Sequence, residues 1–181
     1  IGTTGGKVYR VQAEGSDSLV LKGQLEYPGG FASPLIRIND QVFGICRDAG
    51  SDRIIALNAF PELTEAANKT LEQPFADHLV ALGSQIFFVT ADQKLNCLNP
   101  DLSVSWQIEL PHKLAGSPQD SGNSVVITFD NGDIARLDKT SGETIQAVSL
   151  EEPLASGPVE FNGKWYVNDP QGVVHVLEKM Q

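Results

Sequence analysis

A repeat of about forty residues constrains the fold of this chain more than any other feature of its sequence. One apolar position recurs at Leu57, Leu98, Leu137 and Leu177, with separations of 41, 39 and 40 residues. A second position, at the entry to the first strand of each unit, recurs at Pro34, His78, Pro118 and Pro158, with separations of 44, 40 and 40 residues. Two independent positions that share one period indicate repeated structural units.

The unit itself reads as short strands separated by tight turns. It runs from Gly116 to Leu150 and contains apolar or alternating runs at 124–129, 134–138 and 144–150. The first turn, residues 130–133, contains Asn-Gly, which is typical of a two-residue hairpin and is too short for a twelve-residue calcium-binding loop. The unit therefore predicts an antiparallel sheet, and a period near forty with about four strands predicts a β-propeller blade.

The strand that follows the tight turn is apolar on both faces. In the first full copy, Ile54 and Ala56 share one face and Ile55 and Leu57 the other, and Val174 and Val176 line one face of the last copy. A strand of this kind is expected to be covered on both sides, as it is when blades stack face to face. We therefore predict that Leu57, Leu98, Leu137 and Leu177 occupy equivalent core positions between blades.

These units predict an all-β chain, a β-propeller of four-stranded antiparallel blades. We expect a partial blade at 1–31, blades at 32–75, 76–113 and 114–153, and a partial blade at 154–181. Because neither end blade is complete, about four blades would form an arc or fragment of a seven- or eight-bladed propeller, with a closed four-bladed ring as the alternative. In the second blade, the stretch Pro61–Ala67 is helix-friendly and predicts a surface turn of helix before the last strand.

The charge of the chain favours some partners and excludes others. The net charge is −10, the acidic residues are spread along the sequence, and no basic run is present. This composition argues against binding to nucleic acid or to an anionic membrane, and no apolar stretch reaches the 18 residues of a membrane-spanning helix. The acidic surplus suits a protein partner, and a basic one in particular.

A specific family resemblance rests on the residues around Asp138. The run Leu137-Asp138-Lys139-Thr140-Ser141-Gly142-Glu143 resembles the repeat of the pyrroloquinoline-quinone-like propellers, and Leu154–Val159 is similar to their inter-blade segment. Trp106 stands at the place of the family's docking tryptophan, and the likeness covers essentially the whole chain. The resemblance implies that the Trp106 ring packs between the third and fourth blades, and we expect it against Ala115-Gly116-Ser117.

The same resemblance implies a function. Gln146 replaces the docking tryptophan in the fourth blade, and sparse tryptophans resemble the non-enzymatic members of the family. Examples are the periplasmic propeller lipoprotein of the bacterial outer-membrane assembly machinery and sensor ectodomains of membrane-anchored kinases. The expectation is a non-catalytic, periplasmic or extracellular scaffold for protein–protein interaction or ligand sensing. The alternatives are a sensor ectodomain and a fragment of a quinone-dependent dehydrogenase.

No residue of the sequence is predicted to be catalytic, to bind a cofactor or to bind a metal. Quinone dehydrogenases of this family have a vicinal cysteine pair, whereas Cys46 and Cys97 lie 51 residues apart and are expected to be free, buried thiols. The three histidines, His78, His112 and His175, do not have a metal-ligand spacing, and His175 is expected to be packed or capped on its strand.

Overall fold

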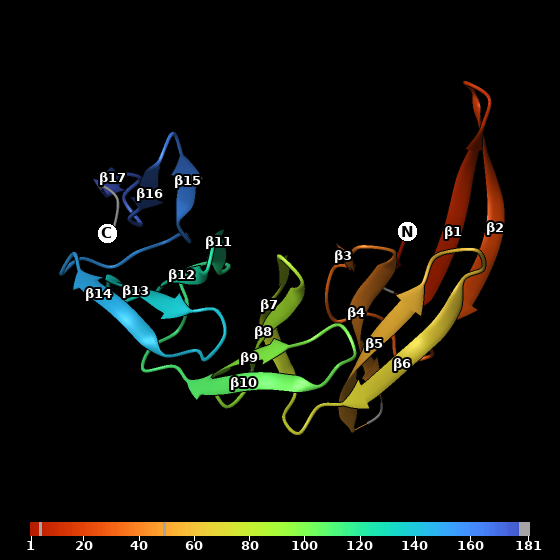
Figure 1. Cartoon of the computed structure of the whole chain (residues 1–181), viewed down its shortest axis with the longest axis horizontal. Coiled ribbons are helices and arrows are strands. Elements are labelled where there is room, and N and C mark those ends of the chain that lie inside the picture. The colour runs from red at the N-terminus through yellow and green to blue at the C-terminus, as the bar shows by residue number, and fades with distance from the viewer. Residues whose placement is uncertain (4, 49, 178–181) are drawn as a thin grey trace. The chain divides into compact units, whose positions relative to one another are not determined.

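The computed structural model describes residues 1–3, 5–48 and 50–177, and the regular structure of these residues is entirely β (Figure 1). It contains no helix, and therefore none that could cross a membrane, within these ranges. The chain divides into two compact units, Ile1–Asp92 with Leu98–Val104, and Gln93–Cys97 with Ser105–Gln181.

The strands form antiparallel sheets in chain order. The hairpin β1 (Lys7–Glu14) and β2 (Ser18–Glu26) comes first. A four-stranded sheet follows, with β3 (Ile36–Ile38), β4 (Gln41–Asp48), β5 (Ser51–Asn58) and β6 (Thr64–Thr70) in the order β3-β4-β5-β6. The next sheet has the order β10-β9-β8-β7 and contains β7 (Phe75–Leu82), β8 (Gln85–Thr90), β9 (Lys94–Leu98) and β10 (Val104–Glu109).

Two further sheets follow, both in the second unit. The first has the order β11-β12-β13-β14, with β11 (Gln119–Ser121), β12 (Ser124–Thr128), β13 (Asp133–Asp138) and β14 (Thr144–Ser149). The second has three strands in the described residues, β15 (Val159–Phe161), β16 (Lys164–Asn168) and β17 (Val174–Leu177), drawn in blue in Figure 1. The predicted all-β fold of four-stranded antiparallel sheets is confirmed. Blade boundaries at the predicted residues remain a prediction, and residues 178–181 of the last one lie outside the described residues.

The core of the first unit lies on both sides of β5. Ile54 and Ala56 belong to one buried apolar cluster, and Ile55 and Leu57 to another. Because neighbouring side chains of a strand point to opposite faces, β5 is covered on both faces, as its sequence predicts. Of the four repeated leucines, Leu57, Leu98 and Leu137 are buried, whereas Leu177 is partly buried.

The predicted turn of helix at Pro61–Ala67 is wrong, because the segment leads into strand β6. Glu65 lies opposite Leu57 and Thr64 opposite Asn58 in the ladder between β5 and β6. Helix propensity is a weak determinant in so short a segment, since an isolated helix of this length is unstable in water. A strand here gives the backbone groups of β5 their hydrogen-bond partners, so the sheet outweighs the local preference.

The prediction that both faces of the last repeat strand are covered is also wrong for the residues described. Val174 and Val176 of β17 are 59% and 50% exposed. The alternation of apolar residues fixes which side chains share a face, but covering that face requires another element. The described part of the chain places none there.

Candidate functional site

The sheet β15-β16-β17 has two faces of different character. On one face, Trp165 and Val167 of β16 are buried, and Leu177 of β17 packs beside them in a cluster with Leu154. The strand register places Trp165 opposite Leu177, and Val167 opposite His175. His175 and Leu177 therefore point to the packed side of the sheet.

The opposite face carries exposed apolar side chains, and we call Val159, Phe161, Val174 and Val176 the open face. Tyr166 lies opposite Val159 on one side and opposite Val176 on the other, so the open face continues across all three strands. Its four members are 50–63% exposed. Contiguous apolar surface of this kind is costly to leave in water, and in a propeller it is the surface on which a neighbouring blade packs.

A polar group lies at the packed side of the same sheet and consists of Glu152, Asp169 and His175. Asp169 follows β16 directly and is held by a tight turn. Its Oδ1 accepts a hydrogen bond of 2.8 Å from the Val173 backbone, and its own N–H donates to the Val173 carbonyl at 3.1 Å. Asp169 as a whole residue is only 4% exposed, and this turn keeps its carboxylate in one place.

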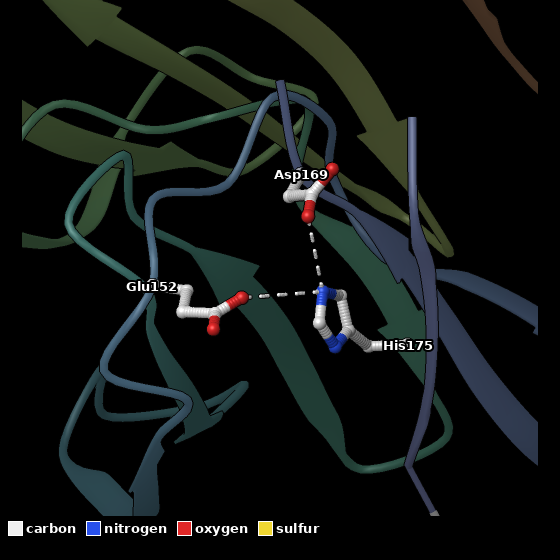
Figure 2. A group of neighbouring side chains, drawn as sticks. All are labelled: Glu152, Asp169 and His175. Carbon is white, nitrogen blue, oxygen red and sulfur yellow. Dashed lines mark ion pairs between the residues drawn. The ribbon is translucent and has the colours of Figure 1, made fainter. Parts of the chain in front are cut away.

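The imidazole of His175 faces both carboxylates through the same nitrogen, as Figure 2 shows. Its Nε2 lies 3.6 Å from Asp169 Oδ2 and 4.0 Å from Glu152 Oε2. Both distances are longer than a hydrogen bond. Nε2 is shielded from solvent and has no hydrogen-bond partner.

Glu152 reaches the group from the loop after β14, and its side chain is 63% exposed. The backbone of this loop is placed by close approach to the β12–β13 turn. Gly132 has φ +101°, and a Cβ built on it would lie 2.3 Å from the Glu152 carbonyl oxygen. The turn must therefore have glycine at this position for the loop to pass so closely.

The three side chains form a set of potential metal ligands that the sequence did not predict. One imidazole nitrogen and two carboxylate oxygens, one from each acidic residue, lie within 4.8 Å of one another. Sequence reasoning missed the group because its members come from a loop, a turn and a strand, at no recognised motif spacing. The nearest sequence signal is Asp169 and His175 at the two sides of one predicted hairpin.

The docking aromatic predicted from the family resemblance is buried at the β13–β14 turn. The Trp106 indole N–H donates to the Lys139 carbonyl at 2.9 Å. Gly142 lies against the ring, since an added Cβ would come within 2.7 Å of a ring carbon. These contacts are with the turn 139–142, whereas the sequence led us to expect the segment Ala115-Gly116-Ser117.

The turn that receives Trp106 is shaped by Asp138. Its carboxylate accepts hydrogen bonds from the backbone N–H groups of Thr140 and Ser141, at 2.8 and 2.9 Å. The hydrogen bond from Ser141, with that from Thr140, holds the pKa of Asp138 below its ordinary value. The Asp-Lys-Thr-Ser-Gly run is thus a local scaffold on which the indole lies.

The other residues singled out in the sequence are not members of this group. Cys46 and Cys97 are both free and buried, and burial raises the pKa of each thiol to about 12. The His78 ring lies 3.6 Å from the Asp77 carboxylate. The exposed His112 ring lies edge-on to the ring of Phe129.

Comparison with known proteins defines the fold. No model of a known protein family matches the sequence, and no curated protein matches it. Among solved structures, BamB from Moraxella catarrhalis is similar at a TM-score of 0.75 and 15% identity, over 98% of this chain and 53% of that one. BBS1N in complex with ARL6DN is similar at a TM-score of 0.69 and 14% identity, over 97% of this chain and 59% of that one. A europium-containing methanol dehydrogenase is similar at a TM-score of 0.50 and 13% identity, over 66% of this chain and 26% of that one.

These similarities show a β-propeller fold, and the resemblance to the pyrroloquinoline-quinone-like propellers is confirmed at the level of the fold. The chain spans about half the length of the first of these structures.

Proposed function

We propose that this chain is a non-catalytic β-propeller scaffold that binds another protein. The open face, which no described residue covers, is the observation that carries the proposal. Its four apolar side chains, Val159, Phe161, Val174 and Val176, lie on a sheet whose other face is already packed. A rigid sheet of this kind loses little conformational entropy when a partner covers it, which favours binding.

The partner that we propose is a protein with an apolar patch surrounded by basic residues. The apolar patch would cover the open face, and the basic rim would match a chain whose net charge is −10. Long-range attraction would then speed the encounter, while burial of the open face would hold the complex together. The structure of BBS1N in complex with ARL6DN, which has a similar fold, supports a role of this kind.

We further propose a bacterial, periplasmic or extracellular location, on the strength of the resemblance to the pyrroloquinoline-quinone-like propellers. The similarity to BamB supports this proposal at the level of fold. Fractionation of cells that produce the chain would test it, since recovery with the cytoplasmic fraction would contradict it.

Site-specific photo-crosslinking tests the binding role. A photoreactive phenylalanine analogue at position 161 is expected to capture one discrete protein in cells that produce the chain. The same analogue at Ser16, in the exposed turn between β1 and β2, is the control and is expected to capture none. The captured protein is then purified, and its affinity is measured by calorimetry.

The affinity measurement decides between a specific complex and a chance contact. Val176→Lys places a charge on the open face and is expected to weaken binding at least tenfold, since burying an unpaired charge is costly. Equal affinity of Val176→Lys and the unchanged chain would refute the proposal. So would a crosslink only to a second copy of this chain, because that result makes the open face a self-association surface.

A further inference from the structure

We propose that Glu152, Asp169 and His175 form a binding site for one divalent transition-metal ion, with Zn²⁺ as the best match. This site is independent of the open face, because the imidazole of His175 points to the opposite side of the sheet from Val174 and Val176. It departs from the sequence expectation that no residue of the chain binds a metal.

The spacing of the donor atoms fits a small ion. Zinc lies about 2.0–2.2 Å from nitrogen and oxygen ligands, so two ligands in a tetrahedral arrangement are about 3.3–3.5 Å apart. His175 Nε2 and Asp169 Oδ2 are 3.6 Å apart, close to this value. The same separation is too long for a hydrogen bond between the two atoms. It therefore suits an ion bound between them better than a direct hydrogen bond.

The imidazole nitrogen supplies an independent argument. His175 Nε2 is shielded from solvent and has no hydrogen-bond partner. A buried polar atom without a partner costs free energy, and such atoms are rare in folded proteins. A metal ion bound to the Nε2 lone pair would satisfy this atom.

The site combines one fixed acidic ligand with one movable ligand. The Asp169 carboxylate is buried, and the Val173 N–H holds its Oδ1, which leaves Oδ2 directed at His175. The Glu152 side chain is largely exposed, and its Oε2 lies 4.0 Å from Nε2. A shift of roughly half an ångström in this exposed side chain would bring Oε2 to the separation from Nε2 that two zinc ligands have.

The mixture of donors selects the class of metal. Calcium and magnesium favour all-oxygen sites with six or more ligands, whereas imidazole favours zinc and its neighbours among the transition metals. Three protein ligands leave a fourth zinc position for water. An ion here would tie the loop after β14 to the β16–β17 hairpin, and we therefore expect it to stabilise the packing of the last sheet.

Calorimetric titration of the chelator-treated chain with Zn²⁺ tests the site. We expect one ion per chain, and at least tenfold weaker binding in Glu152→Gln, Asp169→Asn and His175→Gln. The matched controls are Glu151→Gln, next to Glu152 in the same loop, and His112→Gln, an exposed histidine elsewhere. Both controls are expected to bind Zn²⁺ as the unchanged chain does, and Ca²⁺ and Mg²⁺ are expected to bind at least a hundredfold more weakly.

A spectroscopic measurement identifies the nitrogen ligand. Co²⁺ is expected to give visible d–d absorption bands in the unchanged chain and in His112→Gln but not in His175→Gln. Circular dichroism checks folding. If Asp169→Asn fails to fold, Glu152→Gln carries the test, because its side chain is exposed. Zinc binding that is within twofold of the unchanged chain in both Glu152→Gln and His175→Gln would overturn the proposal, as would the absence of binding below 1 mM.

Discussion

Truncation of Leu137 to alanine tests whether the repeated leucines are core residues of their sheets. Leu137 is 1% exposed on β13, and the change removes three carbon groups, worth about 0.8 kcal/mol each on burial. That transfer contribution is about 2.4 kcal/mol. The cavity contribution is expected to be small, because Leu137 lines a pocket of about 380 Å³ and the new space joins an existing hollow. We expect a loss of about 3 kcal/mol in the free energy of unfolding.

The matched comparison is Leu177→Ala, in the same compact unit and at the equivalent repeat position. Leu177 is only partly buried, so we expect a loss of about 1 kcal/mol. Urea unfolding followed by tryptophan fluorescence reports on this unit, because Trp106 and Trp165 both belong to it. A loss below 1 kcal/mol for Leu137→Ala, or equal losses for the two variants, would refute the reasoning from burial.

Three further changes test other parts of the second unit. Trp106→Phe removes the indole hydrogen bond to the β13–β14 turn and should cost about 1 kcal/mol in thermal unfolding, so an unchanged melting temperature would contradict the docking role. Gly132→Ala should lower the free energy of unfolding more than Gly122→Ala does. Both glycines have a positive φ, which strains an alanine by about 1–2 kcal/mol. Only Gly132 also has a close neighbour, the Glu152 carbonyl. Equal costs would contradict that close approach. Asp138→Asn should be destabilising at pH 7, and its difference from the unchanged chain should shrink below pH 3.8, the ordinary pKa of the group. The sign follows because a carboxylate with a lowered pKa in the folded state stabilises the fold when ionised, and this contribution is lost as the pH falls through the folded value. A difference independent of pH would contradict it.

The sequence predicted the strands and turns well because their signals are local. Asn131-Gly132 marks a tight turn, and the structure has a turn with a positive φ at Gly132 between β12 and β13. It is not the two-residue turn predicted, because the Phe129 N–H donates to the Asp133 carbonyl, which leaves three residues in the loop, and only the glycine has a positive φ. Pro61–Ala67 shows the limit of local signals. Its glutamate, leucine and alanine residues favour a helix in isolation, but the edge of β5 imposes a strand.

The polar group could not be predicted from the sequence, because it depends on tertiary contacts. Glu152 joins it only because its loop passes Gly132, and Asp169 joins it through the turn that closes at Val173. The exposure of the open face in the described residues was not predicted either. Val174 and Val176 have the composition of a covered face, and composition cannot show which element covers it.

The side-chain alternation along β17 has a consequence for how this region can evolve. Point substitutions at Val174 and Val176 can remodel the open face while His175 and Leu177 stay in place, because the two sets point in opposite directions. A single inserted or deleted residue in the turn between Asp169 and Val173 would instead exchange the two sets. Valines would then enter the packed side, and the imidazole would turn outward. The length of this turn should therefore be far less tolerant of change than the identity of the exposed residues.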